Sequence, residues 1–226
     1  MDSAPNKFVV VADFDYTLTK SETETGDQAD ITYDVFAKPA INRSPGCEQL
    51  FKTLNEKYSP IEANSSLSNK EKSPAMVEWW NKANNLIINA GFKQKEILNL
   101  VEESTMRLRY NCALYLEELE RLKIPLIIFS AGISNVIEAS LLFELGRIPE
   151  NVHIMSNTMA LVVNSRNQLF IRSQKWKFAG KVFETVQDLK LKNRIILLGD
   201  SLGDLCMLDG CSLLNESDIT VLKVGF

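Results

Sequence analysis

The sequence predicts an α/β fold, a doubly wound parallel sheet with a helical cap inserted after its first strand. Three observations support this prediction. Four short apolar runs are each followed by polar residues or glycine, helical patterns separate the later runs, and more than a hundred residues without a convincing strand separate the first run from the second. In folds of this class, ligands bind at the carboxyl ends of the parallel strands.

The apolar runs are rich in β-branched residues and leucine, which is typical of parallel strands buried on both faces. They cover residues 8–15, 124–130, 152–156 and 194–200. Apolar residues at helical spacing follow the second run in ISNVIEASLLFEL and precede the last run in FAGKVFETVQDLK. We therefore expect alternating strands and helices in this half of the chain.

The long segment after the first run predicts a separate helical unit. Ser44-Pro45 and Ser73-Pro74 each offer a serine N-cap followed by a proline at the first helical position. A third helix is expected over residues 93–109, and residues 62–73 are typical of a loop. We expect residues 21–109 to form a small cap over the active end of the sheet, and residues 1–20 and 110–226 to form the core.

Composition and charge narrow the class of protein. The chain has 226 residues, 45% of them hydrophobic, and a formal net charge of −4 with a pI near 5.2. This charge excludes a basic surface for nucleic acids or anionic membranes. No apolar run reaches the ~18 residues of a membrane span, and the four cysteines lack metal-ligand spacing. We expect a cytoplasmic monomer with reduced thiols and a small-molecule substrate.

Polar side chains follow every predicted strand and should meet at one edge of the sheet. They are Asp13 and Asp15, then Ser130, then Ser156 and Asn157, then Asp200, Ser201 and Asp204. Three or four converging carboxylates require a hard cation, and ligation by oxygen alone favours Mg²⁺, with Mn²⁺ as a substitute. The sequence therefore predicts a magnesium site at this edge.

The two aspartates after the first strand suggest phosphoryl chemistry. A carboxylate beside Mg²⁺ can attack phosphorus, which is the role expected of Asp13. A second acid two residues later, Asp15, can protonate the leaving oxygen and then deprotonate a water. Ser130, followed by Ala131 and Gly132 at an expected strand-to-helix turn, offers a hydroxyl and main-chain amides to phosphate oxygens. Ser130 could also only cap the helix that follows.

These residues resemble the motifs of the haloacid dehalogenase (HAD) superfamily of phosphohydrolases, in DFDYT, Ser130, a lysine before the last strand, and GDSLGD. The chain is most similar to the cytosolic 5′-nucleotidase III family, which acts on pyrimidine nucleoside monophosphates and 7-methylguanosine monophosphate. The matching segments occur in the same order over nearly the whole chain: DFDYTLT, YSPIE, MVEWWNKANNL, IPLIIFSAGI, HIMSN and ILLGDSLGDL.

The resemblance implies roles for the residues at the strand ends. Asp13 would be the nucleophile and a Mg²⁺ ligand, and Asp15 the general acid and base, with its main-chain carbonyl on the metal. Asp200 would be the third protein ligand. Ser130 and Ala131 would contact the phosphate, and Asp204 and Gly132 would support the site.

The resemblance also places substrate contacts outside the strand ends. Glu62 would reach the nucleobase, and Ala83 stands where the family has a further substrate contact. Lys175, 25 positions before Asp200, would bind phosphate, although Lys177 and Lys181 are neighbouring candidates. Adjacent helical positions diverge by about 100°, so at most one of two tryptophans, Trp79 or Trp80, faces the ligand, and packing between cap and sheet is the alternative for both.

The expected function is Mg²⁺-dependent hydrolysis of nucleoside 5′-monophosphates through an aspartyl phosphate. Pyrimidine nucleotides such as CMP and UMP, or 7-methyl-GMP, are the expected substrates. One alternative is a HAD phosphatase for another small phosphoester. Another is a nucleotide-binding protein without catalysis, because the family pattern continues for some tens of residues past LKVGF, with a last strand and helix, whereas this sequence stops at Phe226.

Overall fold

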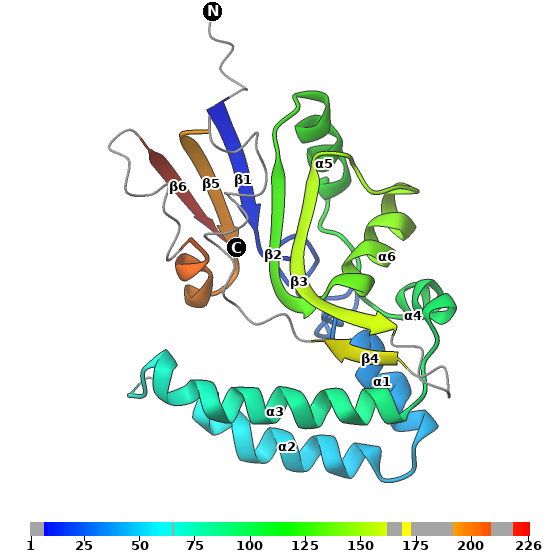
Figure 1. Ribbon diagram of the computed structural model, residues 1–226. Coiled ribbons are helices and arrows are strands. Elements are labelled where there is room, and N and C mark those ends of the chain that lie inside the picture. The colour runs from blue at the N-terminus through cyan, green and yellow to red at the C-terminus, as the bar shows by residue number, and fades with distance from the viewer. Residues whose placement is uncertain (1–6, 65, 162–168, 173–191, 209–218) are drawn as a thin grey trace, which may run out of the picture.

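Six strands form a single sheet in the computed structural model of the chain, which describes residues 7–64, 66–161, 169–172, 192–208 and 219–226 (Figure 1). The sheet order is β4-β3-β2-β1-β5-β6. Five strands are parallel, and β4 pairs antiparallel with the end of β3. The strands are β1 (Phe8–Ala12), β2 (Leu126–Ile133), β3 (Val152–Leu161), β4 (Leu169–Arg172), β5 (Arg194–Gly199) and β6 (Thr220–Gly225).

The predicted fold class is confirmed, and each of the four apolar runs contains a strand. The central strand β1 lies between β2 and β5, with Val11 opposite Ile127 on one side and Leu197 on the other. Strands β4 and β6 were not predicted. Strand β6 runs parallel to β5 from Thr220 to Gly225. The helix expected over residues 178–190 lies outside the described residues.

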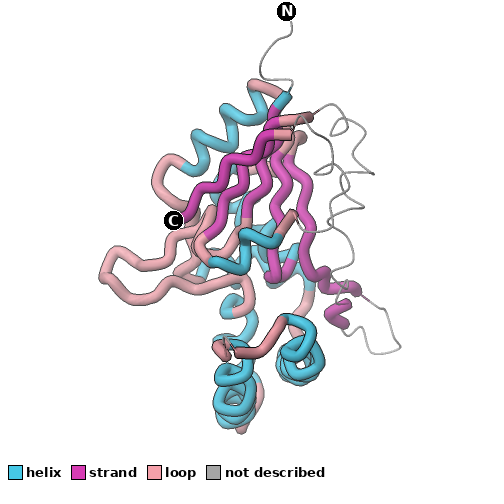
Figure 2. Tube along the Cα trace, turned by 90° about the vertical axis from the view of Figure 1, so that its left-hand side faces the viewer, coloured by secondary structure: helices cyan, strands magenta, loops and turns pink. Residues whose placement is uncertain are grey.

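The helices are distributed between the sheet and a projecting pair. Helices α5 and α6 belong to the half of the chain that builds the sheet, whereas α2 and α3 lie side by side, antiparallel, beyond the carboxyl ends of the strands (Figures 1 and 2). The helices are α1 (Asp34–Arg43), α2 (Cys47–Glu62), α3 (Asn69–Asn89), α4 (Ile97–Glu103), α5 (Cys112–Arg121) and α6 (Ser134–Leu145), with short 3₁₀ turns η2 (Gln94–Glu96) and η4 (Leu202–Cys206). Within the described ranges, no helix combines the length and apolarity that crossing a bilayer requires.

Both predicted serine-proline helix starts are wrong. Ser44 follows the end of α1, and α2 begins only after Gly46, which adopts a left-handed φ of 81°. Ser68 is the N-cap of α3: its side chain accepts from the Glu71 N–H, and the Glu71 carboxylate accepts from the Ser68 N–H. This reciprocal capping box satisfies two exposed donors at the helix start, so Pro74 lies inside the helix.

Three further boundaries differ from the sequence prediction. The expected loop over residues 62–73 is shorter, because the capping box starts α3 at Asn69. The helix expected over residues 93–109 ends as α4 at Glu103, and residues 104–111 form a non-helical linker. Strand β2 continues through Ser130, Ala131 and Gly132 to Ile133 with an irregularity in its pairing to β3, so these residues do not form a turn before α6.

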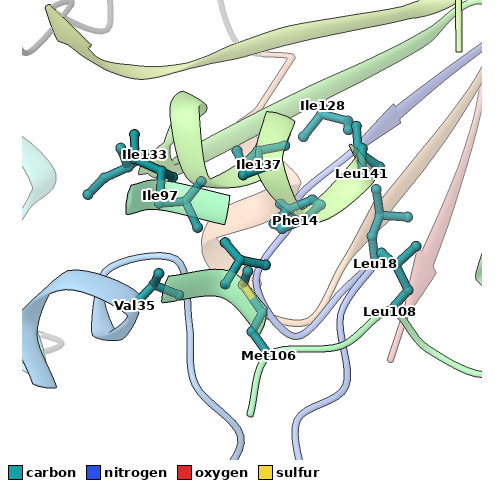
Figure 3. Close-up of a cluster of buried hydrophobic side chains, with 14 of the residues drawn as sticks. Phe14, Leu18, Val35, Ile97, Met106, Leu108, Ile128, Ile133, Ile137 and Leu141 are labelled. Atoms are coloured by element: carbon teal, nitrogen blue, oxygen red, sulfur yellow. The ribbon is translucent and has the colours of Figure 1, made fainter. Parts of the chain in front are cut away.

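The sheet has a hydrophobic cluster on each face. One contains Val9, Val11, Ile127, Ile195, Leu197, Met207 and Leu208. The other, larger cluster joins core residues such as Ile128 and Ile137 to Val35 of α1 and Ile97 of α4 (Figure 3). It therefore extends from the sheet into the segment predicted as a cap.

The chain leaves and re-enters the sheet region at adjacent points. Thr19 forms an isolated antiparallel bridge with Leu108, Lys20 donates its N–H to the Arg107 carbonyl at 2.9 Å, and Arg109 donates its N–H to the Leu18 carbonyl at 2.9 Å. Leu18 and Leu108 both belong to the larger hydrophobic cluster. The two connections between the sheet and the inserted helices are thus hydrogen-bonded to each other.

Candidate active site

The DFD segment, residues 13–15, directly follows β1. Its phenylalanine points into the hydrophobic core, and its two aspartates belong to the polar site. The Phe14 side chain is fully buried in the larger hydrophobic cluster (Figure 3). The Phe14 carbonyl accepts hydrogen bonds from the N–H groups of Thr17, Leu18 and Thr19, which turns the chain sharply. Asp13 donates its N–H to the Leu198 carbonyl of β5 at 3.0 Å. This fixes the first aspartate beside the end of the neighbouring strand.

Three carboxylates meet where β1 and β5 end. One oxygen from each of Asp13, Asp200 and Asp204 lies within 4.8 Å of the other two. The Asp204 carboxylate accepts from the N–H of Ser201 at 2.8 Å and from its hydroxyl at 2.9 Å. Asp200 accepts from the Thr17 hydroxyl at 3.3 Å. Residues from both strand ends therefore hold the cluster in place.

The cluster fits a hard divalent cation. The pKa of Asp13 is raised to about 8, mainly by burial and also by the negative charges of Asp15, Asp204 and Asp200, while a hydrogen bond from the Phe14 N–H opposes the increase. Ionising all these carboxylates together is costly unless a cation lies among them. The donors are carboxylate oxygens alone, as Mg²⁺ prefers. The strand-end pattern placed Asp204 among the converging groups and the family resemblance gave it a supporting role, and the structure brings its carboxylate into the cluster.

Asp15 contacts the segment before α1. Its carboxylate accepts from the Thr32 N–H at 2.8 Å and from the Thr32 hydroxyl at 2.6 Å. Burial raises the pKa of Asp15 to about 6, and the two hydrogen bonds from Thr32 oppose this increase. A carboxyl group with a pKa near neutrality can both donate and accept a proton at physiological pH.

At Gly132, strand β2 lies directly against Asp15 and Thr32. A Cβ atom at Gly132 would lie 2.1 Å from the Thr32 hydroxyl oxygen and 3.1 Å from the Asp15 Oδ2. The first distance is far below van der Waals contact and the second is tight, so a glycine allows the close approach here. Gly199 has a similar place beneath Asp204, where a Cβ would lie 2.4 Å from the Asp204 Cβ.

The end of β2 presents Ser130 and the exposed Ala131 beside Gly132. The Ser130 hydroxyl is buried and accepts from the Gly132 N–H at 3.0 Å. Asn157 of β3 donates its side-chain amide to the Ala131 carbonyl at 2.6 Å, and Ser156 donates its hydroxyl to the Gly132 carbonyl at 2.8 Å. The polar residues that end β3 thus hold the irregular part of β2.

The remaining predicted site residues are on other parts of the chain. Glu62 is the exposed last residue of α2, and Ala83 is buried in α3. Lys175 lies outside the described residues. Neither Glu62 nor Ala83 belongs to the strand-end cluster, so the structure brings together Asp13, Asp200 and Asp204 and places the expected base contacts on the helix pair.

The two tryptophans of α3 face different neighbours. Trp79 stacks on the buried Tyr58 of α2, with ring centroids 5.8 Å apart and an interplanar angle of 14°. Trp80 meets the Tyr33 ring edge-on at 5.6 Å and is 37% exposed. Trp79 therefore packs between the helices, while Trp80 keeps more of its surface open.

Sequence reasoning did not single out Thr32, Thr17 or Arg109. Thr32 holds Asp15, and Thr17 holds Asp200. Arg109 donates from Nε to the Thr17 carbonyl at 2.9 Å and from Nη2 to the Tyr16 carbonyl. These residues lie in non-periodic segments, and the only signal for Thr17 was its place just after DFD.

The fold is that of solved HAD-type hydrolases, and the aspartates lie at its strand ends. A solved structure of phosphoserine phosphatase with a phospho-aspartyl intermediate analogue has the same fold, with a TM-score of 0.57 at 15% identity, over 97% of this chain and 86% of that one. The crystal structure of cytosolic 5′-nucleotidase IIIB bound to cytidine matches with a TM-score of 0.79 at 26% identity, over 98% of this chain and 74% of that one.

The sequence comparisons are more specific. Residues 16–226 match the family described as Pyrimidine 5′-nucleotidase (UMPH-1). The human 7-methylguanosine phosphate-specific 5′-nucleotidase is 33% identical over 98% of this chain and 73% of its own length. A Caenorhabditis elegans protein named for cytosolic 5′-nucleotidase 3 is 35% identical over 97% of this chain. The chain belongs to the pyrimidine 5′-nucleotidase family, and it spans 59% of the length of the Caenorhabditis elegans relative.

Proposed function

We propose that this chain is a Mg²⁺-dependent 5′-nucleotidase that converts nucleoside 5′-monophosphates to nucleoside and phosphate. The cluster of Asp13, Asp200 and Asp204 beside Asp15 carries the proposal, because it combines an oxygen site for a cation with a nucleophile and a proton donor. The names of the relatives support CMP, UMP or 7-methyl-GMP as substrates.

Asp13, Asp200 and Asp204 would hold the Mg²⁺ ion, together with the Asp15 main-chain carbonyl that the family resemblance implies. The ion would neutralise the repulsion between the Asp13 carboxylate and the phosphate, which are both anions. The acidic surroundings that raise the pKa of Asp13 support this role, since the same charges attract a cation.

The proposed reaction has two displacements at phosphorus. In the first, an oxygen of Asp13 forms a bond to phosphorus, the bond from phosphorus to the 5′ oxygen breaks, and the Asp15 carboxyl gives its proton to the leaving oxygen. In the second, a water oxygen forms a bond to phosphorus, Asp15 takes the water proton, and the bond from phosphorus to Asp13 breaks. Phosphate leaves, and both aspartates return to their initial states.

Substrate contacts complete the proposal. Ser130 and Ala131 would contact the phosphate with Gly132 in support, and Lys175 would add a positive charge. Residues 21–109 would act as a cap that excludes water from the first step. The hydrogen-bonded crossing of the two connections at Thr19 supports this boundary.

The base would be bound by the helix pair. Glu62 would contact it, and Ala83 would line the same region. The exposed fraction of Trp80 supports this tryptophan for stacking on the base, while the stack of Trp79 on Tyr58 supports a packing role. We further propose a monomer in the cytoplasm, and the cytosolic name of the Caenorhabditis elegans relative supports this location.

Phosphate release tests the proposed function. The purified chain is incubated with CMP, UMP, 7-methyl-GMP or AMP, in Mg²⁺ and in EDTA, beside Asp13→Asn. We expect metal-dependent release from the first three nucleotides and none from the variant, because an amide is neither a nucleophile nor an anionic ligand. If the folded wild-type chain binds nucleotide but releases no phosphate, it is a nucleotide-binding protein and not an enzyme.

A second comparison separates a nucleotidase from a phosphatase for another small phosphoester. The Glu62→Ala variant should lose the preference of the enzyme among nucleobases. It should still hydrolyse a simple substrate such as p-nitrophenyl phosphate. If base preference is unchanged in this variant, Glu62 does not contact the base. If the wild type shows no preference for nucleotides over simple phosphoesters, the broader phosphatase function is correct.

A further inference from the structure

Arg109 connects the re-entering chain to the turn that follows the two aspartates. Its Nε donates to the Thr17 carbonyl at 2.9 Å, and its Nη2 donates to the Tyr16 carbonyl. The Arg109 main-chain N–H donates to the Leu18 carbonyl at 2.9 Å. One residue therefore binds three consecutive carbonyls, and two of these bonds come from the planar guanidinium.

The turn that Arg109 binds determines where the acidic groups lie. Tyr16 has a left-handed φ of 60°, which is unfavourable for a residue with a side chain. Its N–H donates to the Thr19 hydroxyl at 2.8 Å, and its own hydroxyl donates to the Ala29 carbonyl at 2.9 Å. Tyr16 directly follows Asp15, so a change in this strained turn would move the second aspartate.

The same turn also contacts the other end of the carboxylate cluster. The Thr17 hydroxyl donates to Asp200, and the Thr17 carbonyl accepts from Arg109. The hydroxyl and the carbonyl of Thr17 are therefore fixed by partners on different segments. Loss of the guanidinium would free the carbonyl side of this residue and loosen its contact with Asp200.

The Arg109 guanidinium is itself fixed in position. The Phe226 ring lies 4.8 Å from the guanidinium carbon, in a cation–π arrangement. Phe226 donates its N–H to the Gly199 carbonyl at 3.1 Å, and Gly199 directly precedes Asp200. The ring is therefore attached to the end of β5 beside the carboxylate cluster.

Arg107, two residues earlier, provides a natural comparison. Its guanidinium also binds carbonyl groups, but these belong to Val101, Glu102, Ser104 and Met106 at the end of α4 and just after it. The bonds of Arg107 thus close the end of a helix, whereas those of Arg109 reach the turn next to Asp15. Both arginines lie in the linker between α4 and α5, and both donate hydrogen bonds to main-chain carbonyls. They differ in the segment to which those carbonyls belong.

We propose that Arg109 is a positioning residue for the phosphoryl chemistry, which holds the turn over residues 16–17 so that Asp15 and Asp200 keep their places around Asp13. The inference rests on the proposed function for its kinetic consequence. Its structural part concerns the turn itself and can be measured without turnover. Arginine suits this place because its planar fork binds two carbonyls together, which the single ammonium of lysine cannot do in the same geometry.

The test compares Arg109→Gln, Arg109→Lys and the matched control Arg107→Gln. Amide hydrogen exchange of the segment 13–19 reports on the turn, and kcat and KM for CMP with Mg²⁺ report on catalysis. We expect Arg109→Gln to exchange faster in this segment and to lose about 10- to 100-fold in kcat, with KM changed by less than about threefold. Arg109→Lys should lie between this variant and wild type.

Arg107→Gln should lower the melting temperature while the exchange of segment 13–19 and kcat stay near wild type. Guanidinium ion added at millimolar concentration should restore part of the kcat of Arg109→Gln, and the same concentration of ammonium should not. These outcomes separate positioning from a general loss of stability, which guanidinium cannot restore.

Two results would overturn the inference. One is wild-type exchange and kcat in Arg109→Gln, and the other is an equal effect of both glutamine variants on segment 13–19. If the wild-type chain hydrolyses no nucleotide, the proposed function fails, while hydrogen exchange still decides whether Arg109 holds the turn.

Discussion

Thr32 donates two hydrogen bonds to the Asp15 carboxylate, one from its main-chain N–H at 2.8 Å and one from its hydroxyl at 2.6 Å. Thr32 precedes α1 and belongs to the inserted segment, whereas Asp15 follows the central strand of the sheet. The protonation of a core carboxylate is therefore set in part by a residue of the insertion.

Thr32→Val should raise the pKa of Asp15 above its value of about 6, because the hydroxyl stabilises the ionised carboxylate. A hydrogen bond to a charged group contributes about 1.5–3 kcal/mol, so the pKa should rise by about 1 to 2. The limb of the kcat–pH profile that reports on Asp15 should move to higher pH. Thr32→Ser, which keeps the hydroxyl, should follow the wild-type profile, and a valine variant with that same profile would contradict the assignment.

Gly132→Ala should reduce kcat strongly, because its new methyl group would lie 2.1 Å from the Thr32 hydroxyl oxygen. Displacing Thr32 would move Asp15, and a misplacement of about 1 Å can cost on the order of 100-fold in rate. The matched control is Gly225→Ala, where the nearest atom to a new Cβ is the Gly199 carbonyl oxygen at 3.9 Å. Equal kcat values for the two alanine variants would show that this close approach is unimportant.

Stabilisation by Mg²⁺ should increase with pH. The pKa values of Asp13 and Asp15, about 8 and about 6, both exceed the ordinary value of 3.8. Between pH 3.8 and about 8, the folded metal-free chain binds more protons than the unfolded chain. Its free energy of unfolding therefore decreases as pH rises through this range. A cation binds the ionised carboxylates and opposes this loss.

Melting temperatures in Mg²⁺ and in EDTA, taken from pH about 5 to about 8, measure this effect. The difference between the two should be smallest at the acidic end and largest at the basic end. In Asp13→Asn, most of the increase with pH should disappear. A difference that is constant over this range would mean that proton release from the cluster is not coupled to metal binding.

Ser68→Ala should destabilise the chain by about 1 kcal/mol, since the serine side chain caps α3. For a chain of this length, that corresponds to a decrease in melting temperature of about 2–4 °C. Glu71→Gln, which retains the reciprocal bond of a capping box, should change the melting temperature less. The reverse order of the two variants in a thermal melt would show that the serine does not start the helix.

Much of the sheet could be predicted because buried parallel strands leave continuous apolar runs. The segments around Val10, Ile127 and Ile196 show this clearly. Strand β6 left a weaker signal, because Lys223 interrupts its apolar residues and most of its side chains are exposed. Helix α1 was missed because Pro39, a residue that usually ends helices, lies inside it.

The carboxylates of the candidate site could be expected at one edge, because parallel topology brings strand ends together. The hydrogen bonds that hold these carboxylates in place could not be predicted from the sequence. Thr32 and Arg109 act across long sequence separations, and Arg109 binds main-chain carbonyls that have no residue-specific signature. The hydrogen bonds from Ser201 that hold the Asp204 carboxylate were not predicted either.

The bridge between Thr19 and Leu108 has a consequence for how this protein can change. Since the inserted segment begins and ends at neighbouring points, its ends are already closed, and lengthening it adds only a small entropic cost that grows with the logarithm of its length. The paired helices α2 and α3 can therefore be remodelled without moving the aspartates. Val35 and Ile97 must be retained in any such exchange, because they fill the core that the sheet and the insertion share.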